Sequence, residues 1–114
     1  MYKLIFSEII DEDINSSYNY IKNILEAPIA AENLINELLE KLTYIKVKPY
    51  SRPLVHDKYL ASLGIRSIKV KNYVVFYYVE EDEKYKNGKS INVIRFMYNK
   101  RDWSNILKEK INRS

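Results

Sequence analysis

The residues best suited to binding or catalysis are basic and aromatic side chains in the last third of the chain, from Gly64 to Trp103. Three runs in this segment have the apolar patterns of β-strands, and the pleat of a strand holds its side chains in fixed positions. Cations and phenols fixed in this way form a rigid positive surface that suits a polyanion or an acidic peptide. The candidate binding residues are Arg66, Lys69, Lys71, Arg95, Tyr98, Lys100, Arg101 and Trp103.

The positive charge is concentrated in the second half of the sequence. Residues 1–48 contain 5 Lys and Arg against 8 Asp and Glu, a net charge of −3, whereas residues 49–114 contain 14 against 7, a net charge of +7. A one-sided positive field raises association rates with nucleic acids and with acidic proteins. The same composition also fits a solvated lysine-rich surface that binds nothing.

The length and composition predict one soluble domain over residues 1–114, because a chain of this size supports a single modest core. The sequence is 46% hydrophobic and 30% charged, and no apolar run is long enough for a membrane span. Glu8 interrupts the N-terminus before a signal-peptide core could form, and cysteine is absent. We therefore expect a cytoplasmic protein with no membrane partner.

Apolar periodicity predicts a short strand and two helices in the first half. Lys3–Phe6 has a strand pattern, and we expect the hydroxyl of Ser7 to accept a hydrogen bond at the start of the first helix. That helix should run to about Glu26, and the second should run from Pro28 to just before Pro49, forming an antiparallel αα-hairpin. The apolar stripes are Ile10, Ile14, Tyr18, Ile21 and Leu25, then Ala31, Leu34, Ile35, Leu38, Leu42 and Ile45.

The second half is predicted to add three strands and a final helix. Residues 49–63 are predicted to form a connector that is partly ordered near its end. The strand over 73–79 is apolar and aromatic throughout, so we expect it to be central and covered on both faces. The predicted order is strand 65–70, a two-residue turn at Lys71 and Asn72 with Asn tolerating positive φ, strand 73–79, an acidic hairpin tip at 80–89, strand 91–98 and helix 103–111.

The resulting fold class is α+β, in the order β-α-α-β-β-β-α. We expect an antiparallel-type sheet with the αα-hairpin packed on one face and a short C-terminal helix, leaving the cationic opposite face free. Arg95 shares the phase of Ile91, Val93 and Met97, so it either has a buried partner or marks an opening in that face, and we favour the opening. The sequence has no metal-ligand spacing and no glycine-rich phosphate loop, so we expect no metal and no cofactor.

The element order and three segments together resemble the RelE/ParE superfamily of type II toxin–antitoxin toxins. The segments are PYSRPL at 49–54, GIRSIKVKNYVVFYYV at 64–79 and VIRFMYNKRDW at 93–103. The resemblance covers nearly the whole chain. It implies a small cytoplasmic bacterial toxin that arrests growth until a cognate antitoxin protein neutralises it, with a flexible antitoxin segment covering the basic surface.

Two mechanisms remain open within this superfamily. RelE-like members resemble ribosome-dependent mRNA endonucleases, and ParE-like members resemble poisons of DNA gyrase. Metal-free RNA cleavage requires a base for the 2′-hydroxyl proton, cations for the charge on the phosphate and a donor for the leaving oxygen. The candidate catalytic residues for a nuclease are Arg66, Lys69, Arg95, Tyr98 and Arg101.

Two departures from the RelE pattern favour the gyrase mechanism. Val74 stands where RelE-like toxins carry an arginine, and Phe96, Met97 and Tyr98 occupy the region where nuclease members often carry a histidine. The single histidine, His56, lies in the connector and is expected to be a surface residue. A gyrase poison needs a binding surface and no catalytic group of its own. We therefore favour ParE-like gyrase inhibition, with ribosome-bound mRNA cleavage or an inactive homologue retained for antitoxin binding as alternatives.

Overall fold

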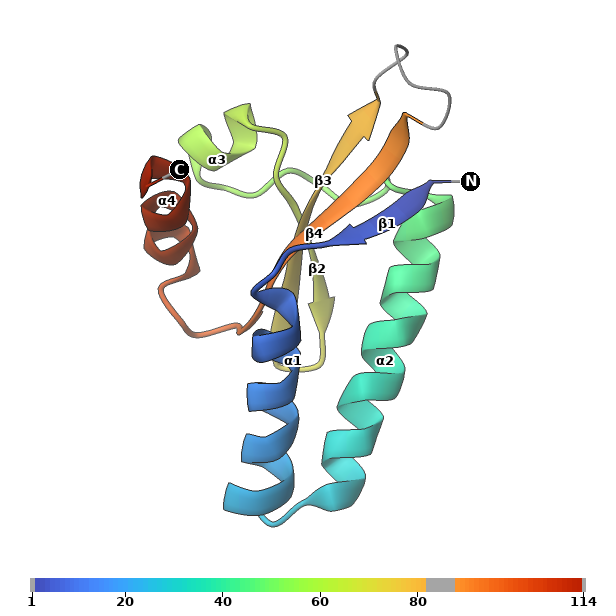
Figure 1. Cartoon of the computed structure of the whole chain (residues 1–114), viewed down its shortest axis with the longest axis vertical. Coiled ribbons are helices and arrows are strands. Elements are labelled where there is room, and N and C mark those ends of the chain that lie inside the picture. Colours follow the sequence, from blue (N-terminus) through green and yellow to red (C-terminus); the bar gives the residue numbers. More distant parts are fainter. Residues whose placement is uncertain (1, 82–87, 114) are drawn as a thin grey trace.

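The computed structural model describes residues 2–81 and 88–113, with side chains up to Glu109 (Figure 1). The predicted acidic hairpin tip falls mostly at 82–87, outside the described residues. The predicted order of strands and helices is confirmed, with a short additional helix in the connector. The elements are β1 (Lys3–Phe6), α1 (Ile10–Asn19), the π-helical turn η1 (Tyr20–Ile24), α2 (Pro28–Val47), α3 (Lys58–Ser62), β2 (Arg66–Val70), β3 (Tyr73–Glu81), β4 (Lys89–Tyr98) and α4 (Trp103–Arg113).

The four strands form one sheet in the order β1-β4-β3-β2. β2, β3 and β4 pair antiparallel, and the predicted two-residue turn joins Val70 to Tyr73. Its positive φ, 53°, lies at Lys71 and not at Asn72. β1 pairs with β4 in parallel, so the sheet is mixed. Apolar alternation indicates which face of a strand is buried but not which strand lies beside it or in which direction, so this pairing was not predictable.

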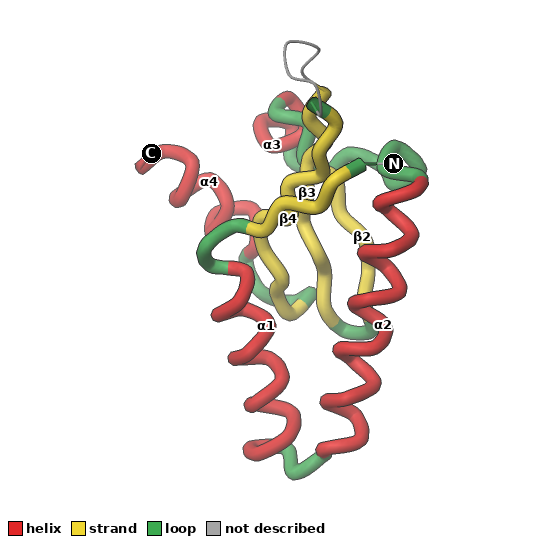
Figure 2. Tube along the Cα trace, turned by 45° about the vertical axis from the view of Figure 1, so that its right-hand side comes forward, coloured by secondary structure: helices red, strands yellow, loops and turns green. Residues whose placement is uncertain are grey.

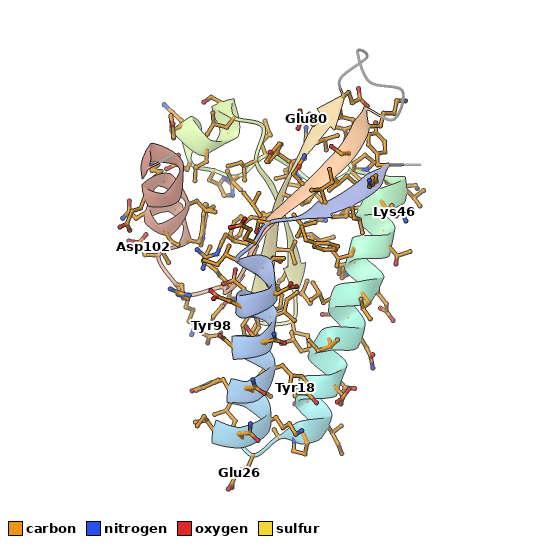
Figure 3. All side chains as sticks on the ribbon, in the orientation of Figure 1. Tyr18, Glu26, Lys46, Glu80, Tyr98 and Asp102 are labelled. Carbon is orange, nitrogen blue, oxygen red and sulfur yellow. The ribbon has the colours of Figure 1, made fainter. Side chains whose placement is uncertain are left out.

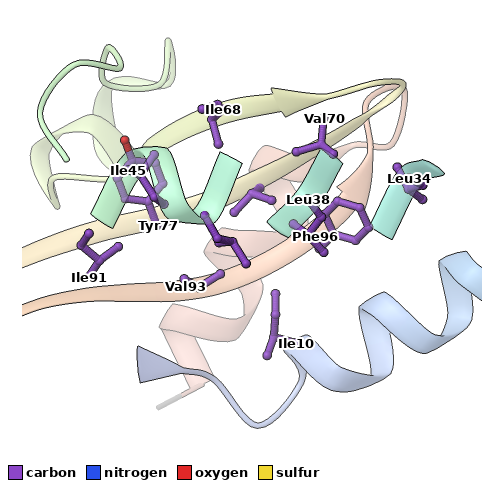
Figure 4. Packing of buried hydrophobic residues seen from close by; sticks show 12 residues of the cluster. Ile10, Leu34, Leu38, Ile45, Ile68, Val70, Tyr77, Ile91, Val93 and Phe96 are labelled. Atoms are coloured by element: carbon purple, nitrogen blue, oxygen red, sulfur yellow. The ribbon is translucent and has the colours of Figure 1, made fainter. Parts of the chain in front are cut away.

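The αα-hairpin covers one face of the sheet, as predicted (Figures 1 and 4). The stripe of α2 is buried through Ala31, Leu34, Leu38, Leu42 and Ile45. The first core cluster consists of Ile10, Leu34, Leu38, Leu42, Ile45, Ile68, Val70, Val75, Tyr77, Ile91, Val93 and Phe96. The stripe predicted for the first helix is wrong at Leu25, which is 55% exposed. The π-helical turn η1 widens the last turn there and carries Leu25 out of line with the stripe.

A second apolar layer covers the other face. Its buried residues are Val55, Leu60, Ile65, Phe76, Met97 and Leu107, contributed by the connector, α3, β3, β4 and α4. β3 places Val75 and Tyr77 in the first cluster and Phe76 in the second, which confirms that it is covered on both faces. The expectation that this opposite face is free is wrong, because the connector folds back as α3 and lies with α4 over the sheet (Figure 1).

The junction between β1 and α1 also differs from the prediction. Ser7 does not cap α1; its hydroxyl donates to the Ile94 carbonyl at 2.8 Å and its amide donates to the Val93 carbonyl at 3.0 Å. β1 pairs only as far as Val93, so the edge of β4 beyond that point would otherwise present unpaired backbone groups. The chain entering α1 therefore closes an edge of the sheet.

Candidate functional site

The fold divides the predicted site residues among three environments. Arg66 and Lys69 lie on the edge strand β2, and Lys71, Tyr98, Lys100 and Arg101 lie near the β2–β3 turn. Arg95 is buried, and Trp103 is partly buried against the second core cluster. Each environment gives its residues a different role.

Arg95 is buried and paired, with 8% of its surface exposed. Its Nε lies 2.7 Å from Oδ2 of Asp13 and its Nη2 lies 3.0 Å from Oδ1 of Asp13. Oδ2 of Asp13 also accepts the amide of Phe96 at 3.0 Å. The expectation that Arg95 marks an opening is wrong, because α1 supplies the buried partner that the sequence could not identify. The ion pair fixes α1 to β4.

Trp103 belongs to the layer that closes the second face. Its ring centroid lies 5.1 Å from that of Phe76. Further along α4, Nζ of Lys108 lies 2.5 Å from Oδ2 of Asp57, the residue that caps α3. The hydrogen bond from Lys108 is the largest cause that lowers the pKa of Asp57. α4 thus anchors α3 to the sheet. The side chain of Ile111, at the end of the helix predicted over 103–111, lies outside the described residues.

Four predicted residues form an exposed patch at one end of the sheet, termed here the turn-end surface. Its members come from the β2–β3 turn, the last residue of β4 and the chain just after it. They are Lys71, Tyr98, Lys100 and Arg101, and all four are exposed. The turn-end surface therefore carries three cations and one phenol.

Backbone hydrogen bonds hold the turn-end surface together. The Asn99 amide donates to the Asn72 carbonyl at 2.8 Å, joining the chain after β4 to the β2–β3 turn. The Arg101 amide donates to the Tyr98 carbonyl at 3.1 Å. The Tyr98 ring packs edge-on against Tyr73, with centroids 5.7 Å apart, and Tyr98 remains 39% exposed. The cations of this surface are thus carried on an ordered backbone.

Arg66 lies well away from the turn-end surface. In the antiparallel register Arg66 is opposite Tyr77, whereas Tyr98 is opposite Tyr73. The two positions are four residues apart on β3, which corresponds to about 13 Å along the strand. Tyr98 lies at the lower end of the sheet in Figure 3, and Glu80, further along β3, lies near the upper end.

Arg66 is engaged with the connector. Its guanidinium carbon lies 5.2 Å from the centre of the Tyr50 ring, and its Nη1 donates to the Arg52 carbonyl at 2.5 Å. Beside it, the buried Tyr77 hydroxyl donates to the Pro49 carbonyl at 2.9 Å, and burial raises the pKa of Tyr77 to about 12. These contacts hold the connector against β2 and β3.

Lys69 lines a groove of about 470 Å³, termed here the β2 groove, whose residues come from α2, the connector and β2. Figure 2 shows α2 running beside β2. The residues that line it are Glu40, Lys41, Tyr44, Arg52, Ile68 and Lys69. The lining therefore includes three basic residues and one acidic residue. Neither Lys41 nor Arg52 was predicted from the sequence, although Arg52 lies in the PYSRPL segment at 49–54. Lys41 could not be singled out because its helix is acidic overall.

His56 is exposed in the connector, as predicted. Among residues 2–81 and 88–113, no three His, Cys, Asp or Glu side chains are grouped so that they could hold a metal ion. Over the same residues, no helix combines the length and the apolar character needed to cross a membrane.

Comparisons with known proteins agree on the fold and the family. The family model for the ParE toxin of the type II toxin–antitoxin system parDE matches residues 4–103. A solved structure described as a chromosomal ParDE toxin–antitoxin system from P. aeruginosa has a TM-score of 0.64 and 15% sequence identity, covering 86% of this chain and 96% of that chain. At this identity the structural likeness shows the fold. No individual curated protein sequence matches the chain.

Proposed function

Because the chain belongs to the ParE toxin family of type II toxin–antitoxin systems, we propose that it arrests growth by inhibiting DNA gyrase. Membership of this family makes a cognate antitoxin its partner.

The observation that supports gyrase inhibition over mRNA cleavage is the distribution of the candidate catalytic groups. Metal-free cleavage needs a base, a cation and a proton donor around one phosphate, all within hydrogen-bond reach. Arg66 and Tyr98 are separated by about 13 Å along the sheet, and Arg95 is already paired with Asp13. A toxin that acts by binding needs no such convergence.

The turn-end surface is the proposed contact with the target. Gyrase acts on DNA, so its working complex presents a polyanion next to protein. Lys71, Lys100 and Arg101 are exposed together there and are carried on a hydrogen-bonded backbone. Exposed cations of this kind raise the rate of association with a negatively charged partner and do so most strongly at low salt.

A gyrase assay with purified protein tests the proposal directly. The toxin should slow plasmid supercoiling and increase the amount of gyrase-cleaved plasmid as its concentration rises. Unchanged supercoiling and unchanged cleavage at saturating toxin would exclude gyrase as the target. Addition of the antitoxin should restore supercoiling.

One observation favours the alternative target, ribosome-bound mRNA. Tyr98, Lys100 and Arg101 bring a phenol and two cations into one exposed segment, and a ribosome could complete such a site. In a translation extract the nuclease mechanism requires toxin-dependent cuts in the mRNA at codon positions, whereas the gyrase mechanism predicts intact mRNA. If induced expression does not slow growth, the chain is an inactive homologue retained for antitoxin binding.

A further inference from the structure

A row of three aromatic rings leads from the core to the turn-end surface. The innermost ring, Phe96, is buried and stacks on Tyr73, with centroids 5.0 Å apart and an interplanar angle of 16°. Tyr98 forms the outer end of the row, packed edge-on against Tyr73 and 39% exposed. Because the inner rings are packed against the core, the Tyr98 ring is held in a defined position where a ligand can reach it.

Three cations accompany this exposed ring. Lys100 and Arg101 follow Tyr98 in the chain, and Lys71 comes from the adjoining β2–β3 turn; all three side chains are exposed. The adjacent acid, Asp102, accepts a side-chain hydrogen bond from α4 at 2.7 Å. A polyanion that approaches the Tyr98 ring therefore meets positive charge on the same surface.

The backbone of the turn-end surface is already engaged within the protein. The Asn99 amide donates to the Asn72 carbonyl at 2.8 Å, the Arg101 amide donates to the Tyr98 carbonyl at 3.1 Å, and the Trp103 amide donates to the Arg101 carbonyl at 2.8 Å. A peptide that docks in an extended form depends on main-chain hydrogen bonds of this kind. The surface is therefore suited to a ligand that is recognised through charge and ring faces, as a nucleic acid is.

The exposed ring favours a single strand over a duplex. Cations beside an accessible aromatic ring are the combination with which proteins bind single-stranded nucleic acids without reading their sequence, since phosphates meet the cations and every base has a face that can stack. The bases of a duplex are already stacked on one another. An unpaired base is therefore the group that gains most from contact with Tyr98.

We propose that the turn-end surface binds single-stranded DNA, with an unpaired base stacked on Tyr98 and the neighbouring phosphates held by Lys71, Lys100 and Arg101. This inference rests on the proposed gyrase function, because a staggered break in DNA exposes unpaired bases. It assigns the surface to the DNA of the target complex and not to the gyrase protein.

Two substitutions at Tyr98 separate the ring from its hydroxyl. Tyr98→Leu keeps an apolar side chain against Tyr73 but removes the aromatic face, whereas Tyr98→Phe keeps the face and removes the hydroxyl. The matched control is Tyr59→Leu, which removes an exposed tyrosine ring on α3, away from the turn-end surface. Thermal unfolding establishes that each variant is folded.

The probe is a fluorescently labelled oligothymidylate of about 12 nucleotides, a length within the usual site sizes of single-strand binders, titrated with purified toxin and followed by anisotropy. Tyr98→Leu should bind this strand roughly tenfold more weakly than the unmodified toxin, while Tyr98→Phe and Tyr59→Leu should bind it equally well. Binding of a duplex of the same length should not change in any of the three. Equal single-strand affinities of Tyr98→Leu and the unmodified toxin would overturn the proposal.

The cations are tested by the salt dependence of the same titration. Lys71→Gln, Lys100→Gln should lower the slope of log affinity against log salt by about 1.4, because each phosphate contact on a single strand contributes about 0.7. Lys3→Gln, Lys58→Gln removes two exposed cations elsewhere and should leave the slope unchanged. Equal slopes for both double variants would contradict phosphate binding at the turn-end surface.

Two competitors distinguish DNA from other acidic ligands. Polyglutamate should displace the oligothymidylate less effectively than unlabelled oligothymidylate of equal charge, since it offers no base to stack. Equal displacement would mean that the surface responds to charge alone, and the proposal would be wrong. Tighter binding of an oligouridylate of the same length would instead favour the mRNA target and overturn the assignment to DNA.

The gyrase assay separates this inference from the proposed target. Tyr98→Leu should inhibit gyrase more weakly than the unmodified toxin, in proportion to its loss of affinity for the single strand. If the unmodified toxin inhibits gyrase but binds no oligothymidylate, the DNA site is wrong and the gyrase target stands. If it binds the oligothymidylate through Tyr98 but does not inhibit gyrase, the target is wrong and the DNA site stands.

Discussion

Asp13 and Arg95 form a buried ion pair between residues 82 positions apart in the chain. Their side chains are 9% and 10% exposed, and the shortest distance between them is 2.7 Å. The same carboxylate accepts the Phe96 amide at 3.0 Å, on the edge of β4 that β1 leaves uncovered. One carboxylate therefore neutralises a buried cation, closes a sheet edge and fixes the start of the αα-hairpin.

Asp13→Ala should lower the free energy of unfolding by about 3–5 kcal/mol, because it leaves the Arg95 charge and the Phe96 amide buried without their partner. Urea unfolding at neutral pH measures the loss. The matched control is Glu12→Ala, which removes a neighbouring exposed carboxylate and should change stability by less than about 0.5 kcal/mol. The double variant Asp13→Leu, Arg95→Met should recover most of the loss, and no recovery would mean that hydrogen bonding to Phe96 dominates.

Arg66→Ala should destabilise the protein by about 1–3 kcal/mol, since it removes a charged hydrogen bond to the Arg52 carbonyl and the contact with the Tyr50 ring. Arg66→Lys should retain only part of the stability that Arg66→Ala loses, because an ammonium group lacks the planar, multiply donating geometry of a guanidinium group. Thermal unfolding and induced growth arrest are measured together. Loss of arrest with unchanged stability would instead place Arg66 on the surface that binds the target.

Tyr77→Phe should cost about 1–2 kcal/mol at neutral pH, because the Pro49 carbonyl loses its buried donor. Burial raises the pKa of Tyr77 from 10.0 to about 12, so burial favours the protonated phenol. The resulting contribution to stability is complete below pH 10 and is lost as the pH rises toward 12. Unfolding temperatures from neutral pH upward should fall less steeply for Tyr77→Phe above pH 10 than for the unmodified toxin. Tyr20→Phe, the same substitution at an exposed tyrosine, is the control and should change stability at neutral pH by less than about 0.5 kcal/mol.

Lys100→Ala, Arg101→Ala should weaken gyrase inhibition by roughly tenfold at low salt, with stability changed by less than about 0.5 kcal/mol. Both side chains are exposed, so their removal leaves the core intact. The difference from the unmodified toxin should shrink as salt rises, because exposed charges are screened. Lys3→Ala, Lys58→Ala is the control with the same change of charge. Equal inhibition by all three proteins would remove the turn-end surface from the mechanism.

The order of the elements and the faces that they bury follow from the amino-acid sequence alone. The stripe from Ala31 to Ile45 and the continuous apolar run of β3 are local periodic patterns, and a period of 3.6 or 2 residues directly specifies which side of an element meets the core. The same local patterns, with the segments at 49–54, 64–79 and 93–103, carried the resemblance to the toxin superfamily that the family match over residues 4–103 bears out.

The contacts between residues far apart in the chain follow from the three-dimensional fold and not from local patterns. The partner of Arg95 is on α1, β1 pairs in parallel with β4, and α3 with α4 covers the face expected to be free. These relationships depend on the path of the chain between distant segments, which a local period does not encode. The basic residues between Gly64 and Trp103 are likewise divided between the β2 groove, the turn-end surface and the core. This division arises because adjacent residues of a strand face opposite sides of the sheet and successive strands end at different places.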